Sequence, residues 1–221
     1  MDYTVIIVAG GSGSRMNSIL PKQFVAINGT PILMHTINAF INFSSQISII
    51  LVLPENHIST WKDLCVELNF NIEHQITIGG NARFDSVKNG LKLIKKQCII
   101  GIHDAVRPFV SKELIKSVFE SAEIYGNAIP SIAINDSVRQ IQNNSSLPIS
   151  RDQLRIIQTP QCFKSDILKL AYEQNFNDSF TDDASVVEAC GEKIHLVEGA
   201  RENIKITTSY DMVIAEALIK I

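Results

Sequence analysis

Short runs of β-branched and other apolar residues alternate with amphipathic segments along the first 135 residues of the chain. Strands that are apolar on both faces and separated by helices form parallel sheets with helices on both sides. The sequence therefore predicts an α/β fold with a mostly parallel sheet. The expected strands are 3–9, 47–53, 98–104 and 127–134, and the expected helices lie near 31–43, 57–69, 83–95 and 111–125.

The pattern changes from Asn135 to Pro160, where the sequence is polar and rich in turn residues. Apolar residues alternate around SVRQIQ and QLRIIQ, which predicts a β-hairpin around NNSSLP that projects from the core as an arm at about 136–159. A two-stranded ribbon is marginally stable alone, so we expect a second subunit to cover it and form a homodimer. Further expected elements are helices near 164–175 and 182–190, strands in IHLVEG and NIKIT, and a helix from Ser209.

Composition limits the kinds of protein that this chain can be. With 221 residues, 45% hydrophobic and 19% charged, we expect one domain over 1–221. No run approaches the roughly 18 apolar residues of a membrane span, and no secretory signal pattern opens the chain, so we expect a cytoplasmic protein without a membrane partner. A net charge of −3 without a Lys/Arg cluster argues against nucleic acid as a partner.

The cysteines do not indicate a disulfide framework or a zinc site. They are far apart and form no Cys-x-x-Cys pair, so we interpret them as buried thiols. These cysteines are Cys65, Cys98, Cys162 and Cys190.

The glycine-rich stretch VAGGSGSRMNSILPKQF (8–24) follows the first expected strand, where bare backbone N–H groups can converge on phosphate oxygens. It is not a dinucleotide fingerprint, because Met16 stands where a third Gly or Ala is needed, and no acidic residue follows at about 20 residues. It is not a P-loop, because no Gly-Lys-Ser/Thr follows Gly13.

What remains is a loop whose backbone can wrap a triphosphate, flanked by the cations Arg15 and Lys22. Pro21 stiffens the segment that carries Lys22. A plain strand-to-helix turn would explain the glycines alone, but the PKQF segment favours a phosphate site. The candidate loop residues are Ala9, Gly10, Gly11 and Gly13.

Several segments together resemble a known family. The segments AGGSGSRM, PKQF, GGNARFDSV, HDAVRPF, QTPQCF, TDDASVVEACG and ENIKIT occur in order from Ala9 to Thr207. They resemble nucleotidyltransferases that couple a nucleoside triphosphate to a sugar or polyol phosphate, and in particular the 2-C-methyl-D-erythritol 4-phosphate cytidylyltransferase family of isoprenoid biosynthesis. The resemblance implies a Rossmann-like sheet, a homodimer, CTP and a polyol phosphate as substrates, and Mg²⁺ or another divalent cation.

On the nucleotide side, the resemblance implies that GGNARFDSV reads the cytosine ring and that Arg15 and Lys22 bind the phosphates. From the residues alone, Asn81 and Ser86 could equally cap a helix. Asn81 stands where the resemblance leads us to expect an acidic residue. The implied nucleotide contacts are Ala9, Gly10, Gly11, Gly13, Gly80, Asn81, Ser86 and Ala105.

Asp104 and Arg107 in HDAVRPF follow a buried strand, at the end where open α/β sheets bind ligands. A carboxylate there can help to hold a divalent cation, and Arg107 can pair with a phosphate. The two side chains could instead pair with each other. The resemblance favours ligand binding by both residues and implies that Asp104 is a metal ligand.

On the acceptor side, the resemblance implies that Arg151, across a dimer interface, and Lys205 hold the polyol phosphate. Taken alone, Arg151 would be ordinary surface, and Lys205 between Ile204 and Ile206 would extend into water. The other implied acceptor contacts are Ser137, where the family usually has Thr, Thr159 and Thr181.

The implied reaction is attack of the acceptor phosphate on the α-phosphorus of CTP with release of pyrophosphate. Because both partners are anions, we expect catalysis by positioning and by the cations Arg15, Lys22, Arg151 and Lys205. The alternatives are a ribitol-5-phosphate cytidylyltransferase, which shares PKQF, HDAVRPF and QTPQ, and a nucleotide-binding module without activity.

Overall fold

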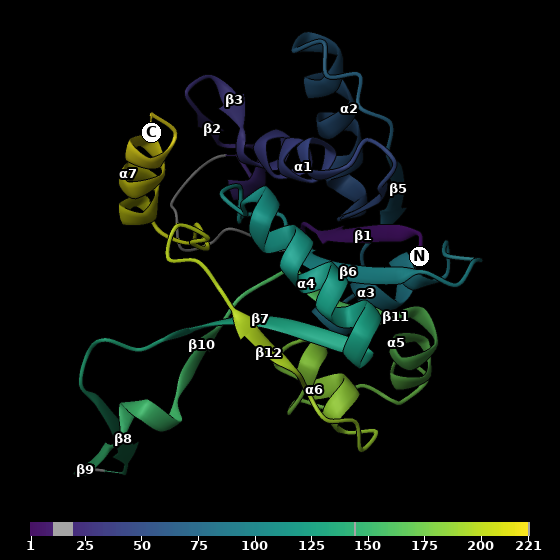
Figure 1. Cartoon of the computed structure of the whole chain (residues 1–221). Coiled ribbons are helices and arrows are strands. Elements are labelled where there is room, and N and C mark those ends of the chain that lie inside the picture. Colours follow the sequence, from purple (N-terminus) through teal and green to yellow (C-terminus); the bar gives the residue numbers. More distant parts are fainter. Residues whose placement is uncertain (11–19, 144, 221) are drawn as a thin grey trace.

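The computed structural model describes residues 1–10, 20–143 and 145–220 and contains one main sheet (Figure 1). Its strand order is β10-β7-β11-β6-β1-β4-β5, with β12 paired to β7. The strands β6, β1, β4 and β5 are mutually parallel, whereas β11 runs antiparallel to both β6 and β7. The bounds are β1 Tyr3–Val8, β4 Ser48–Leu53, β5 Gln75–Ile78, β6 Ile99–Asp104, β7 Asn127–Ala133, β10 Arg155–Ile157, β11 Gln161–Lys164 and β12 Leu196–Glu198.

Helices cover both faces of this sheet, as the sequence predicts. In β1, Val5 and Ile7 join the core cluster that contains α1 and α4 side chains, while Ile6 joins the cluster that contains α3, α5 and α6 side chains. A strand buried on both faces explains why the apolar runs are continuous. The helices are α1 Ile32–Phe43, α2 Ile58–Glu67, α3 Arg83–Leu91, α4 Lys112–Tyr125, α5 Ser165–Ala171, α6 Asp183–Glu188 and α7 Ser209–Leu218.

The expected arm is present, with a different second strand from the one that the sequence favours. Strands β8 Val138–Gln142 and β9 Ser145–Ile149 form an antiparallel hairpin that projects away from the sheet (Figure 1). The alternating segment QLRIIQ does not pair with β8. It contributes β10, which pairs antiparallel with β7 at the sheet edge.

Other expectations need correction. NIKIT is not a strand: residues 203–207 belong to no helix or strand, although the Ile206 amide donates to the Val106 carbonyl at 2.9 Å and the Ile206 side chain is buried. Strands β5 and β11 were not predicted, because each is only four residues long. The pairs β2 Ala26–Ile27 and β3 Thr30–Pro31 form a separate small ladder.

No helix in the described part of the chain is long and apolar enough to span a membrane. Three short 3-10 turns complete the described elements, η2 Lys22–Phe24, η3 Glu55–His57 and η4 Arg151–Gln153.

Close packing around β6 gives a test of the fold. A Cβ at Gly101 would lie 2.8 Å from Cζ of Phe119 and 3.2 Å from Sγ of Cys162. We therefore expect Gly101→Ala to lower the free energy of unfolding by about 1–3 kcal/mol, measured by urea denaturation. The double variant Gly101→Ala/Phe119→Leu should lose less free energy of unfolding than the sum of the losses in the two single variants. Full additivity would contradict this packing.

Candidate active site

A cavity of about 310 Å³ lies at the carboxyl ends of β1 and β6. This is the end of a parallel sheet where α/β proteins bind ligands. Several candidates for nucleotide binding line it, together with three cations, Lys22, Arg83 and Lys205. The lining residues that were predicted are Ala9, Gly10, Lys22, Gly80, Asn81, Ser86, Asp104, Ala105 and Lys205.

The PKQF segment fixes the backbone of Lys22 at the cavity wall. Pro21 precedes the 3-10 turn η2, and the buried Gln23 side chain donates to the Ala9 carbonyl at 3.0 Å, which ties the turn to the end of β1. Phe24 is buried and stacks on Trp61, with ring centroids 6.1 Å apart. Three of the four residues thus hold the turn in place, so that Lys22 starts from a set position.

The second wall is the turn from Gly79 to Ser86. The Ser86 hydroxyl accepts from the Gly80 amide at 3.0 Å and donates to the Ala82 carbonyl at 3.1 Å, while the Asp85 carboxylate accepts from the Ala82 amide. Ser86 and Asp85 therefore close the turn at the start of α3; the capping interpretation named Ser86, together with Asn81, and did not name Asp85. That role does not exclude a contact with the base, because a hydroxyl oxygen has a second lone pair.

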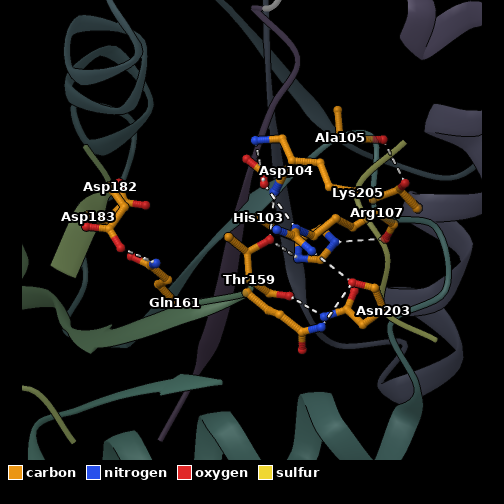
Figure 2. A network of polar contacts seen from close by, with 12 residues as sticks. His103, Asp104, Ala105, Arg107, Thr159, Gln161, Asp182, Asp183, Asn203 and Lys205 are labelled. Atoms are coloured by element: carbon orange, nitrogen blue, oxygen red, sulfur yellow. Dashed lines mark hydrogen bonds and ion pairs between the residues drawn. The ribbon is translucent and has the colours of Figure 1, made fainter. Parts of the chain in front are cut away.

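Asp104, the last residue of β6, is surrounded by cations (Figure 2). Its Oδ2 lies 3.1 Å from both Arg107 Nε and Lys205 Nζ, and its Oδ1 lies 4.0 Å from Arg83 Nε. Burial alone would raise the pKa of Asp104, but Arg83, Lys205 and Arg107 hold it well below its usual range. Three positive charges around one carboxylate leave a net positive centre, which favours binding of phosphate.

Arg107 is buried and largely committed to protein partners. Besides the Asp104 contact, its Nη1 donates to the Asn203 carbonyl at 2.8 Å. The pairing of Asp104 with Arg107, which the sequence left open, is therefore present. Lys205 is more exposed, with 43% of its side-chain surface accessible, so it can turn from Asp104 to a bound anion at lower cost than Arg107.

A buried hydrogen-bond chain supports the backbone of Asp104 (Figure 2). His103 Nε2 lies 3.1 Å from the Arg107 carbonyl, which can only accept, so Nε2 carries the proton. Nδ1 then accepts from the Thr159 hydroxyl at 3.0 Å, and that hydroxyl accepts from the Asp104 amide at 3.1 Å. Thr159, which was predicted to contact the acceptor, thus has its only hydroxyl proton directed at His103.

A second cavity of about 200 Å³ adjoins the first. Arg83, Asp104 and Lys205 line both cavities. Two ligands that occupy the two cavities would therefore meet at this shared wall. The remaining lining residues of the second cavity are Arg107, Ile157, Gln158, Thr159, Gln161, Thr181 and Asp182.

The structure brings together only part of the predicted cation set. Lys22 and Lys205 line the first cavity. Arg151 lies in η4 beside the arm, is exposed, and donates to the Asn135 carbonyl, and Ser137 is exposed at the base of the arm. Within the described residues, neither lines the two cavities. Arg15, Gly11 and Gly13 lie outside the described residues.

Sequence reasoning missed Arg83, Gln161 and Asp183. Arg83 Nη2 donates to the fully buried Asp183 at 2.6 Å. The buried Gln161 side chain donates to Asp182 at 2.8 Å and accepts from the Ala184 amide at 2.9 Å. Acidic pairs such as DD at 182–183 are common helix caps, and no local pattern links Arg83 to a residue 100 positions away.

Among the residues that the structure describes, no cluster of three His, Cys, Asp or Glu side chains could hold a metal ion. Of the described residues that line the first cavity, Asp104 is the single carboxylate. Mg²⁺ is commonly bound by one or two carboxylates and by substrate phosphates, so Asp104 fits an ion that shares its coordination with a nucleotide. It does not fit an ion held by protein side chains alone.

Gly80 gives a test of the turn that forms the cavity wall. A Cβ at Gly80 would lie 2.1 Å from Cβ of Asp85, whereas one at Gly79 would lie 3.2 Å from the Ser86 hydroxyl. We expect Gly80→Ala to distort the turn and weaken binding of CTP by about tenfold or more, or about 1.4 kcal/mol. Gly79→Ala should weaken the binding of CTP less than Gly80→Ala does. Equal affinities for the two variants in calorimetric titration would contradict this geometry.

The buried His103 predicts a pH dependence of stability. Burial lowers the pKa of His103 from 6.5 to about 4. Between pH 6.5 and about 4, the His103 ring therefore binds a proton in the unfolded chain and not in the folded chain. The free energy of unfolding then decreases as the pH falls through this range. From pH 7 to pH 5 we expect the free energy of unfolding to fall by roughly 2 kcal/mol, measured by urea denaturation without nucleotide or divalent cation. An NMR titration in which the folded His103 ring protonates near pH 6.5 would contradict it.

Comparison with known proteins identifies the family of this chain. The family model for IspD, 2-C-methyl-D-erythritol 4-phosphate cytidylyltransferase, matches residues 3–221. Proteins of that name from Bacteroides fragilis and Bacteroides thetaiotaomicron are 51% and 49% identical, over 99% of this chain and 100% of theirs.

Solved structures match over the whole chain as well. The 4-diphosphocytidyl-2C-methyl-D-erythritol synthase of Anaerococcus prevotii superposes with a TM-score of 0.84 at 28% identity, covering 100% of this chain and 99% of that one. The 2-C-methyl-D-erythritol 4-phosphate cytidylyltransferase of Thermus thermophilus gives 0.81 at 28% identity, with 100% of both chains covered. The chain belongs to the 2-C-methyl-D-erythritol 4-phosphate cytidylyltransferase family.

Proposed function

We propose that this chain transfers the cytidylyl group of CTP to 2-C-methyl-D-erythritol 4-phosphate, giving 4-diphosphocytidyl-2-C-methyl-D-erythritol and pyrophosphate. Family membership supports the choice of substrates. The observation that carries the proposal is the pair of adjoining cavities with a common wall of Arg83, Asp104 and Lys205. CTP occupies the cavity that contains Lys22, and the acceptor occupies the cavity that contains Thr181.

The chemical obstacle is the repulsion between two phosphate groups. At an effective dielectric constant of about 20, two unit charges 4 Å apart interact with about 4 kcal/mol. Cations already in place at the common wall offset that repulsion without reorganisation during the reaction. Lys22 acts on the nucleotide phosphates, and Lys205 leaves Asp104 to hold the acceptor phosphate, which attacks the α-phosphorus in line.

The proposed cofactor is Mg²⁺ or another divalent cation that enters with CTP. Asp104 would hold it together with the nucleotide phosphates. When bound, it neutralises charge on those phosphates. If Lys205 turns to the acceptor phosphate, one of the three cations around Asp104 moves away, and its carboxylate becomes a better metal ligand.

The closest alternative is transfer of the same group to ribitol 5-phosphate. A nucleotide-binding module without activity is the second alternative. A pyrophosphate-release assay with CTP separates all three: turnover with methylerythritol phosphate supports the proposal, turnover with ribitol 5-phosphate supports the first alternative, and no turnover with either supports the second. The family match favours methylerythritol phosphate.

Lys22 gives a direct test of the proposed catalytic cations. Because Gln23 and Phe24 hold the turn, we expect Lys22→Ala to leave the fold intact and to lower kcat by about 10²–10³. The measurement is pyrophosphate release, with circular dichroism as the fold control. Near-normal turnover by a folded Lys22→Ala variant would contradict the assignment.

We also propose that the enzyme is a homodimer and that Arg151 acts on the acceptor of the partner subunit. The apolar side chains of the arm support this, since Ile141 and Leu147 are 74% and 50% exposed in one chain. A cytoplasmic location remains part of the proposal, since CTP is an ordinary intracellular nucleotide.

Mixing two inactive variants tests whether Arg151 acts in trans. If it does, a hybrid dimer of Lys22→Ala and Arg151→Ala subunits contains one site with both defects and one intact site. We expect activity to reappear after the variants are mixed and exchanged. Analytical ultracentrifugation reports the dimer, and a mixture that stays inactive although hybrids form would show that Arg151 does not act across the interface.

A further inference from the structure

The first residues of α3 and α6 are joined by an ion pair to which the proposed chemistry assigns no role, although Arg83 itself belongs to the common wall of the two cavities. Arg83 begins α3 and Asp183 begins α6, and their Nη2 and Oδ2 atoms are 2.6 Å apart. Asp183 is fully buried and lines neither cavity in the described part of the protein. Arg83 lines both cavities. The pair therefore connects the wall between the cavities to the interior.

Asp183 is held rigidly from a third element. Its Oδ1 accepts from the Tyr172 hydroxyl at 2.6 Å. Tyr172 directly follows α5 and stacks on Phe84, with ring centroids 4.7 Å apart. Burial and Asp183 raise the pKa of Tyr172 well above its usual value, so its hydroxyl remains a donor. Both carboxylate oxygens of Asp183 are thus engaged in short bonds, and the direction of its side chain is fixed.

The residues that Asp183 positions lie in the acceptor cavity. Thr181 and Asp182 immediately precede it and line that cavity. Gln161, which belongs to β11, donates to the Asp182 carboxylate and accepts from the Ala184 amide. Figure 2 shows Gln161 pointing toward Asp182 and Asp183, apart from the Asp104 cluster. The start of α6 is consequently held by Gln161 on one side and by Arg83 on the other.

We propose that Arg83 is a positioning residue, which uses Asp183 to set the Thr181–Asp182 wall of the acceptor cavity at a fixed distance from Asp104. Its planar guanidinium carries N–H groups in two directions. Arg83 can therefore donate to Asp183 through Nη2 while its Nε faces Asp104. A lysine carries its three donors on one nitrogen and cannot reproduce contacts made from two separate nitrogens. The inference rests on the proposed function for its substrates.

The nucleotide cavity should be much less dependent on this pair. The Gly79–Ser86 turn is closed by its own bonds from Ser86 and Asp85, and Lys22 is held by Gln23 and Phe24. The Asp183→Asn change breaks the pair but keeps the charge of Arg83 at the common wall, so it should raise the KM for the acceptor and lower kcat, while the KM for CTP changes little. This asymmetry distinguishes positioning from general damage to the fold.

A purely structural role is the alternative, because an unpaired buried carboxylate is strongly destabilising. The variants Arg83→Gln, Arg83→Lys, Asp183→Asn and Arg83→Gln/Asp183→Asn separate the two roles. The double variant removes both charges, so we expect its melting temperature to exceed that of Arg83→Gln. If Arg83 positions the acceptor wall, kcat/KM for the acceptor is roughly 10²-fold below that of the unmodified protein in Asp183→Asn, which keeps the charge of Arg83 at the common wall, and it stays low in the double variant and in Arg83→Lys.

Lys92→Gln is the matched control. Lys92 lies at the other end of α3, is exposed, and bonds to Asn89 at 2.9 Å. The Lys92→Gln change removes one positive charge from the same helix, and Lys92 lines neither cavity. We expect its kinetics to equal those of the unmodified protein.

Hydrogen exchange of the amides of residues 181–185 tests the inference without the reaction. Exchange should accelerate in the double variant relative to the unmodified protein and to Lys92→Gln. Unchanged exchange, or unchanged acceptor kinetics in the double variant, would overturn the inference. An unmodified protein that is inactive with both acceptors would overturn the proposed function, while faster exchange at residues 181–185 would still support the positioning role.

Discussion

The carboxylate of Asp104 is the interaction on which the rest of the site depends. It stands at the end of the buried strand β6 and lies within 4.0 Å of Arg83, Arg107 and Lys205. Three cations converging without a counter-charge would repel one another, and one carboxylate without partners would be costly to bury. Together they form a stable centre with a net positive charge, to which a phosphate can be drawn.

The fold supplies the parts of this centre from distant points of the chain. Strand β6 carries Asp104, α3 begins with Arg83, and the extended segment after β12 brings Lys205. The buried chain of His103, Thr159 and Asn203 holds these segments together, since Asn203 donates to the Thr159 carbonyl and accepts from Arg107. Packing of the sheet therefore decides the geometry of the charges, and the charges decide which ligands the two cavities attract.

Sequence predicted the parts of the structure whose signal is local. The apolar runs of β1, β4, β6 and β7 are confirmed because both faces are buried, and PKQF was singled out because Pro21 restrains Lys22. The antiparallel strand β11 was missed, since four residues carry too little periodicity. The Arg83–Asp183 pair was missed because the sheet, and not the spacing along the chain, brings the two residues together.

The central claim is that nucleotide and acceptor meet at the wall of Arg83, Asp104 and Lys205. A crystal structure with a non-reactive CTP analogue, a divalent cation and methylerythritol phosphate tests it most directly. The account predicts the α-phosphate and the acceptor phosphate side by side at this wall, with Lys205 on the acceptor. An α-phosphate bound away from Asp104, or an acceptor outside the cavity lined by Thr181, would contradict it.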